Sequence, residues 1–415
     1  MHEIVPRYYE KFKCIGSECP ETCCEGWRIS MDEGAYKKYQ ALDNNKLKNT
    51  AKKYIKKYPS EVEDQVKGYF AYIELKDGTC PFLGKDRLCK VQKECGSDFL
   101  SKTCAEYPRK VSVYPKKNTR SLNLGCPESA RLILCDSNSM ELIEDNLYKI
   151  NNYIKLYDKE QKDTYKLLGE KIFNISFSLI KDKRYSLIQS LCVIQKIMEE
   201  QKNLEFFPER LDKVYNFLID TFKDYNLVNI DTSSLKIEFL REFYQFVHKQ
   251  NDDANDSSNR MSKSFVSYVD YAYKTLIKDF RKPKEQYENF KNLKEKYYDR
   301  IIEKSPFFLR NYFLNEFFAN SVMFTQKKAF IEKRLEVALL GAVIPQILIM
   351  GQIGTKKLDL SLADATRAFY LTHKNIGHLT EYRGNFEYKF KDGLNSILEK
   401  IDKNSLFNSL LFLLD

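Results

Sequence analysis

The residues of this chain best suited to chemistry are its cysteines, and they are concentrated near the N-terminus. Of the 11 cysteines, all but Cys192 lie within the first 135 residues. In a reducing compartment, thiols clustered in this way more often hold a metal ion or cluster, whereas in a secreted protein they indicate a disulfide framework. We therefore expect a thiol-bound metal site in the first third of the chain.

The densest group is Cys14-x4-Cys19-x3-Cys23-Cys24, which Glu25-Gly26-Trp27 follows. Adjacent cysteines make poor disulfide partners, so these four thiols cannot all pair locally without strain. They suit a soft metal ion or an iron–sulfur cluster. The alternative is a set of free cysteines that pack as small hydrophobic side chains. Trp27, the only tryptophan, is expected to shield the site from water.

A second group consists of Cys80, Cys89 and Cys104. The segments 68–75 and 79–83 are typical of strands, and a turn at Gly84-Lys85-Asp86 predicts a returning strand over 87–91. Such a hairpin would bring Cys80 and Cys89 close together, as in metal-binding knuckles. Cys95 is interpreted as an incidental thiol in a turn.

A further thiol, Cys126, precedes Pro127 and Glu128. Proline fits the first turn of a helix and a carboxylate there complements the helix dipole, so a helix is predicted to begin at this point. Cys126 is then the N-cap residue, where aligned N–H groups lower the pKa of a thiol. The alternative is a helix start that merely holds a buried cysteine.

The remaining sequence disfavours several functions. It contains no Gly-rich phosphate loop, no His-Glu-x-x-His and no Cys-His-Asp pattern. The net charge is +10, but the short basic runs are interpreted as solvated helix faces and no nucleic-acid groove is expected. The longest apolar run, 337–350, is shorter than the roughly 20 residues that span a bilayer, so it predicts a buried helix kinked at Pro345 and no membrane insertion. No apolar signal region precedes it, so we expect a cytoplasmic protein; the sequence assigns no oligomeric state.

The elements that position these residues divide the chain in two. Apolar residues recur at helical spacing from Leu142 and Ile143 onward, and helical runs continue to residue 375. We predict a mostly α fold, with a small irregular cysteine-rich N-terminal module that contains a short β-hairpin and a large helical body. The predicted boundaries are 1–136 for the metal- or cluster-binding module and 137–415 for the helical domain, with a candidate break at 251–259.

With these residues in place, the sequence resembles the flagellin lysine N-methylases. The match is detailed over the first third of the chain and loose beyond it, where it touches Asn311-Tyr312 and the segment from Arg367 to His373. Its first half also resembles a wider group of zinc- or iron-chelating proteins, whose opening motif has x2 where this chain has x4. The matching residues are Tyr9, Lys11, Cys14, Cys19, Thr22-Cys23-Cys24, Gly26-Trp27, Ile29, Cys80-Pro81-Phe82-Leu83, Cys89, Leu100, Cys104, Tyr107-Pro108-Arg109, Cys126-Pro127-Glu128 and Ala130-Arg131.

The resemblance implies transfer of a methyl group from S-adenosylmethionine to surface lysines of flagellin, with a cysteine-bound [4Fe–4S] cluster. The radical-type Cys-x3-Cys-x2-Cys motif is absent, since Cys24 directly follows Cys23. A cluster that organises the site is therefore favoured over a radical mechanism. Zinc is the alternative metal, and a non-enzymatic zinc- or iron–sulfur-binding redox or interaction module is the alternative function. The candidate ligands are Cys14, Cys19, Cys23, Cys24, Cys80, Cys89, Cys104 and Cys126.

Methyl transfer to lysine makes a physical demand, because the amine is almost fully protonated at neutral pH and an ammonium group is not a nucleophile. The site must remove the proton and hold the amine in line with the methyl–sulfur bond. Glu128 and Tyr107 are the predicted groups for proton removal or amine orientation. Arg109 is predicted to pair with the carboxylate of the cofactor.

Overall fold

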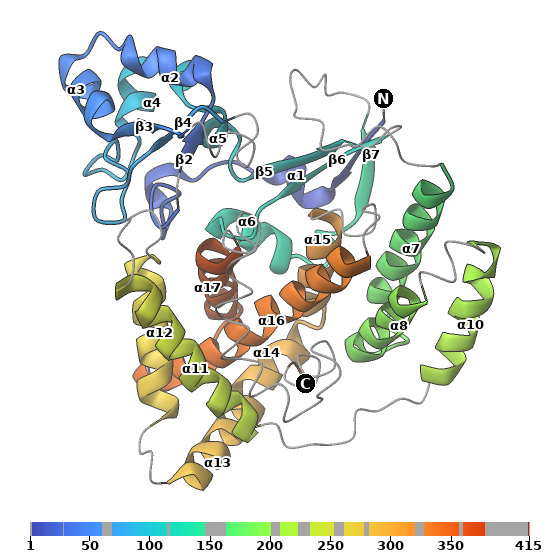
Figure 1. Cartoon of the computed structure of the whole chain (residues 1–415). Coiled ribbons are helices and arrows are strands. Elements are labelled where there is room, and N and C mark those ends of the chain that lie inside the picture. The colour runs from blue at the N-terminus through green and yellow to red at the C-terminus, as the bar shows by residue number, and fades with distance from the viewer. Residues whose placement is uncertain are drawn as a thin grey trace.

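The computed structural model describes most of the chain, and helices dominate it (Figure 1). The predicted mostly α class is confirmed. The first two positions of the predicted break at 251–259 belong to helix α11 (Ser233–Asp252). Its other positions lie outside the described residues. The described residues are 2–27, 29–59, 69–113, 117–145, 163–200, 208–222, 233–252, 261–277, 282–319, 328–356, 360–377 and 414.

The cysteine-bearing part of the chain holds more regular structure than the sequence predicts. A three-stranded antiparallel sheet of order β2-β4-β3 packs with short helices into a small module, drawn in blue in Figure 1. Apolar side chains at alternate positions of β4, Ala71 and Ile73, are buried in it. Its elements are β2 (Ile29–Met31), α2 (Glu33–Gln40), α3 (Asn45–Tyr54), β3 (Ile55–Lys57), β4 (Ala71–Ile73), α4 (Lys90–Cys95), η3 (Ser97–Phe99) and α5 (Lys102–Glu106).

A second sheet joins this module to the helices. Its strand order is β5-β6-β1-β7, and β1 (His2–Pro6) lies parallel to β6 and antiparallel to β7. The helix predicted from Leu142 is wrong at its start, because Leu142–Asp145 forms β7. Its backbone hydrogen bonds go to β1, a partner that the local apolar spacing does not reveal. The other elements here are α1 (Arg7–Lys11), η1 (Gly16–Glu18), β5 (Arg109–Val113), β6 (Lys117–Leu122) and α6 (Pro127–Leu134).

The helical body follows the predicted apolar spacing closely. Helix α16 (Lys328–Lys356) packs against α12 (Lys263–Leu276) and α17 (Leu362–Thr372). Gly351 makes the α12 contact possible, because a Cβ atom there would lie only 2.1 Å from the Ala272 Cα atom. The remaining elements are α7 (Asp163–Lys181), α8 (Leu187–Glu199), η4 (Pro208–Arg210), α10 (Leu211–Phe222), α11 (Ser233–Asp252), α13 (Pro283–Leu293), η6 (Lys294–Tyr298), α14 (Asp299–Lys304), α15 (Phe307–Ala319) and η8 (His373–Gly377).

Helix α16 contains the predicted buried apolar segment, with Pro345 inside the helix. The window Leu335–Gln352 is long and apolar enough to cross a membrane by length and composition, but 78% of it is buried inside the molecule. A helix apolar on all sides is typical of a protein core as well as of a membrane. Here the window packs as a core helix.

The buried apolar residues form two separate cores. The small core draws on residues 29–91, whereas the large core extends from Val5 to Leu414 and includes the apolar face of α6. Tyr8 fixes the N-terminal segment to the body, since its hydroxyl donates a buried 2.6 Å hydrogen bond to Asn315 Oδ1 on α15. The N-terminal dozen residues thus belong to the packing of the body.

Candidate functional site

The first cysteine group lies on an irregular segment that pairs with the loop leading to Cys80. The Cys80 amide donates to the Cys24 carbonyl at 2.7 Å, and the Gly26 amide donates to the Gly78 carbonyl at 3.1 Å. The indole nitrogen of Trp27 donates to the Cys23 carbonyl at 2.8 Å. These bonds place Cys24 beside Cys80, although 55 residues separate them in sequence.

The second group reaches the same place by different elements from those predicted. The returning strand over 87–91 is wrong, because only a single antiparallel bridge joins Leu83 and Cys89, and helix α4 begins directly after Cys89. The turn still brings this thiol back toward Cys80. Cys104 lies on α5, where the Ser101 hydroxyl caps the helix by accepting from the Cys104 amide at 3.3 Å.

The eight candidate ligand thiols lie in one neighbourhood with Cys23 at its centre. The Cys23 thiol is hydrogen-bonded to that of Cys24, which is in turn hydrogen-bonded to that of Cys80. Cys23 also lies within electrostatic reach of four further thiols, and one of these, Cys19, lies near Cys14. Buried Tyr39 of the small core lies beneath Cys24, Cys80, Cys89 and Cys104. The four thiols around Cys23 are Cys19, Cys89, Cys104 and Cys126.

Burial raises the pKa of four of these thiols and so favours their neutral form; they are Cys19, Cys89, Cys104 and Cys126. Loss of water contact raises the pKa of Cys19 to about 11 and that of Cys104 to about 12. The hydrogen bond to Cys24, followed by burial, raises the pKa of Cys23 far above its usual range. A bound cation would supply the charge that stabilises a buried thiolate, and its binding would release the thiol protons.

Cys126 is the N-cap residue of α6, as the sequence predicts, with Pro127 at the first position of the helix. The predicted lowering of its pKa is wrong. The Ser129 and Glu128 amides do lower the pKa of this thiol, but burial is the larger effect and raises it above its usual value. Desolvation therefore outweighs the helix terminus at this position.

The donor chemistry fits a soft metal or cluster, but the arrangement is not that of a single-ion site. Among the described residues, no three His, Cys, Asp or Glu side chains are placed as ligands of one metal ion. An iron–sulfur cluster holds its cysteine sulfurs farther apart than a tetrahedral zinc ion does, because the inorganic core lies between them. The identity of the metal or cluster therefore stays a prediction.

The three remaining cysteines have different surroundings. Cys135 shares a 3.2 Å hydrogen bond with the hydroxyl of Thr366, and Cys192 is buried in α8 of the body. Cys95 is the last residue of helix α4 and not a turn residue as predicted; it packs at the edge of the small core, near Cys89. The surroundings of Cys135 and Cys192 therefore belong to the helical body.

A buried ion pair connects the thiols to the helical body. Lys374 Nζ on η8 lies 2.8 Å from Glu21 Oε2, and both side chains are 3% exposed. Glu21 lies between Cys19 and Cys23 in sequence, and the Lys374 charge lowers the pKa of Cys23 against the larger effects that raise it. Gly125, beside Cys126, makes room for η8, since a Cβ atom there would lie 2.9 Å from the Lys374 Cα atom. The C-terminal part of the chain therefore contributes directly to the thiol site.

Sequence reasoning missed Lys374, Glu21 and Tyr370. The side chain of Tyr370 lies close enough to Glu21 and Cys19 for their charges to contribute to its pKa, which burial raises to about 12. The only signal was the segment from Arg367 to His373, which directly precedes Lys374. Residue type alone gives no reason to pair two side chains 353 positions apart.

Glu128 is engaged by its own helix. Both of its carboxylate oxygens accept hydrogen bonds from Arg131, at 2.7 and 2.8 Å, and the residue is 8% exposed. This ion pair fixes the Glu128 carboxylate in the first turn of α6, two residues after Cys126. A role in proton removal stays a prediction; each oxygen keeps one further lone pair while it accepts from Arg131.

Of the other two predicted site residues, Tyr107 lies at the edge of the thiol neighbourhood and Arg109 lies beside Phe12. The Tyr107 ring packs against that of Trp27 with centroids 5.5 Å apart, which places it beside the segment that carries Cys23 and Cys24. Trp27 is half-buried there. Arg109 is exposed on β5, and its guanidinium lies 5.0 Å from the centre of the Phe12 ring. Their predicted roles toward lysine and cofactor remain predictions.

Comparison with known proteins connects the helical body to one family. The family described as "FliB lysine N-methylase C-terminal domain" matches residues 173–400. This range contains η8 and Lys374, which contact the thiol segment. No solved structure matches the chain.

Three curated proteins are similar over part of the chain. Two carry the name Lysine-N-methylase, from Salmonella typhimurium and Salmonella choleraesuis, and each is 34% identical over 197 residues, which is 46% of this chain and 47% of the relative. The third, Flagellar biosynthetic protein FliU from Salmonella muenchen, is 35% identical over 162 residues, 38% of this chain and 91% of that protein. The alignment thus spans about half the length of the two lysine methylases.

Proposed function

This chain belongs to the FliB lysine N-methylase family, and we propose that it methylates lysine side chains of flagellin in the cytoplasm, with S-adenosylmethionine as methyl donor. The names of the relatives support lysine methylation in a flagellar context. The observation that carries the proposal is the contact between Lys374 of the family-matched body and the segment that holds Cys19 and Cys23. Binding sites commonly lie where two packed regions of a protein meet.

The reaction has a simple balance. S-adenosylmethionine supplies a methyl group on a positively charged sulfur; the lysine nitrogen forms the new N–C bond as the S–C bond breaks, and the nitrogen gives up a proton. The protein must therefore accept that proton and keep water from the reacting atoms. We assign proton removal or amine orientation to Glu128 and Tyr107. Arg109 is assigned to bind the carboxylate of S-adenosylmethionine.

We further propose that a [4Fe–4S] cluster, held by four or more of the eight gathered thiols, organises the site. Four of them (Cys24, Cys80, Cys89 and Cys104) line the small core, while Cys126 begins a helix of the large core. Ligands drawn from both cores would hold the two regions in a fixed relation. The cluster needs no part in electron transfer for this role, since methyl transfer from a sulfonium is not an oxidation.

Mass spectrometry of flagellin co-expressed with and without this protein tests the proposal. We expect methylated lysines only in the presence of the protein, and an isotope-labelled methyl group fed as methionine should appear on the same lysines. Unmodified flagellin in both cultures, with the protein folded and loaded with iron, would contradict the proposed activity.

A further inference from the structure

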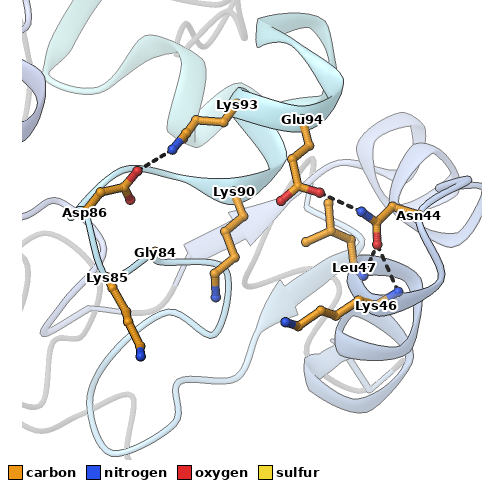
Figure 2. Close-up of a pocket in the computed structure, with 9 residues that line it drawn as sticks. All are labelled: Asn44, Lys46, Leu47, Gly84, Lys85, Asp86, Lys90, Lys93 and Glu94. Carbon is orange, nitrogen blue, oxygen red and sulfur yellow. Dashed lines mark hydrogen bonds and ion pairs between the residues drawn. The ribbon is translucent and has the colours of Figure 1, made fainter.

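A hollow on the small module lies at the tip of the loop whose ends carry Cys80 and Cys89. Its volume is approximately 380 Å³, and it opens to solvent between the N-terminal ends of α3 and α4 (Figure 2). The loop contributes Gly84, Lys85 and Asp86, while α4 contributes Lys90, the residue after Cys89. The other lining residues are Asn44, Lys46, Leu47, Lys93 and Glu94.

The hollow carries an excess of positive charge. Lys93 is paired with Asp86, and Glu94 accepts a 2.6 Å hydrogen bond from Asn44. The ammonium groups of Lys46, Lys85 and Lys90 have no hydrogen-bonded or ion-paired partner in the part of the chain that the structure describes. Figure 2 shows Lys46 and Lys90 extending toward the open space, with Lys85 on the loop beside it. The lining holds four lysines and two carboxylates, and this net positive charge favours an anionic ligand.

The backbone around the hollow argues against a tight phosphate cradle. Such cradles are built from free amide groups at helix termini and loops. Here the Lys46 and Leu47 amides donate to the Asn44 side chain at 2.9 and 3.1 Å. The Lys90 amide donates to the Phe82 carbonyl at 2.9 Å and the Gly84 amide to the Leu88 carbonyl at 2.8 Å. With these four amides engaged, the long and adjustable lysine side chains are the groups that we expect to bind an anion.

We propose that this hollow binds an acidic segment of the protein substrate, through carboxylates that pair with Lys46, Lys85 and Lys90. The inference rests on the proposed function, which requires the enzyme to hold a protein. The hollow cannot receive the lysine to be methylated, because its cations repel an ammonium group. The hollow lies on the loop between Cys80 and Cys89, so a bound acidic segment would share this loop with two of the candidate ligands. The role of the hollow is then to bind the substrate, and it takes no part in the methyl transfer itself.

A charge-matched pair of variants tests this binding without requiring turnover. The first is K46Q/K85Q/K90Q in the full chain. The control is K48Q/K52Q/K56Q, which removes the same number of charges from α3 and β3 of the same module but from residues that do not line the hollow. The probe is a fluorescein-labelled poly-glutamate peptide, followed by fluorescence anisotropy with and without competing inorganic phosphate.

We expect the first variant to weaken peptide binding about tenfold, from three exposed ion pairs, and the control to weaken it less than about twofold. Raising the salt from about 0.15 M to about 1 M should abolish the difference. With an acidic flagellin substrate, the first variant should raise KM and leave kcat unchanged. Equal weakening by both variants, no peptide binding by the wild-type chain, or displacement of the peptide by phosphate at low concentration would overturn the proposal. A chain that binds the peptide at this hollow but methylates nothing would refute the proposed function and leave the anion site standing.

Discussion

The small and large cores differ in what holds them together. The small core is confined to residues 29–91 and is bordered by the thiols of Cys24, Cys89, Cys95 and Cys104. The large core runs through nearly every helix of the body and buries long apolar faces such as that of α16. A core of modest size seldom stabilises a domain alone and usually needs a metal or a disulfide in addition. From this comparison we expect the small region, and not the large one, to depend on its thiols for stability.

The largest expected effect follows directly from this difference. In C23S we expect the loss of bound iron and sulfide and the unfolding of the small module, because Cys23 is at the centre of the thiol neighbourhood and metal binding contributes folding energy. The helical body should retain its structure. Iron and sulfide analysis after anaerobic purification, with hydrogen exchange resolved along the chain, measures both effects.

C135S is the matched control, since this thiol bonds to Thr366 in the body and not to the other cysteines. It should leave the iron content unchanged. The proposed difference between the two regions would be contradicted if C23S bound as much iron as the wild type. It would also be contradicted if C23S and C135S lost the same amount of iron.

The ion pair between the regions predicts the next largest effect. K374M leaves the Glu21 carboxylate buried without its partner, which should cost about 3–5 kcal/mol of unfolding free energy. The double variant E21M/K374M removes both charges and should recover most of that loss, because apolar side chains of similar size can replace a buried pair. Chemical denaturation of the wild type and both variants checks this; a double variant no more stable than K374M would show that the loss does not come from the unpaired buried carboxylate.

A smaller, catalytic effect is expected at Glu128. E128Q should lower the methylation rate about a hundredfold with the cluster retained, if this carboxylate accepts the amine proton. R131Q breaks the same ion pair but keeps the carboxylate, so it should keep most of the activity. Turnover and thermal stability measured on both variants separate the two roles. Similar rates for both variants would limit Glu128 to a structural part in α6.

Local sequence signals predict much of the fold, and they fail where distant segments pair. Helical spacing locates α7, α8, α11, α12 and α17 because each buries one face against the body. The same spacing mispredicts Leu142, which joins a strand formed by the first residues of the chain. Of the strands around the cysteines, β4 lies within the strand predicted over 68–75, whereas the others were missed, since strands of three to six residues carry too few alternating positions to be recognised.

The candidate site was likewise predictable only in part. Cysteine type and spacing single out eight thiols that the structure brings into one neighbourhood, and the N-cap position of Cys126 follows from Pro127 and Glu128. The buried pair of Glu21 and Lys374 could not be predicted, because charged side chains are ordinarily exposed and nothing in the sequence marks these two. The domain boundary at residue 136 stays a prediction. The two apolar cores show how the chain packs, and they do not show that either region folds independently.

The measurement that tests the central claim most directly is methyl transfer to purified flagellin before and after removal of iron by an anaerobic chelator. Our account predicts that transfer from S-adenosylmethionine stops when iron is removed, while the helical body stays folded by circular dichroism and activity returns when iron and sulfide are restored. Full methyl transfer by iron-free protein would contradict it, because the gathered thiols would then organise nothing that the reaction needs.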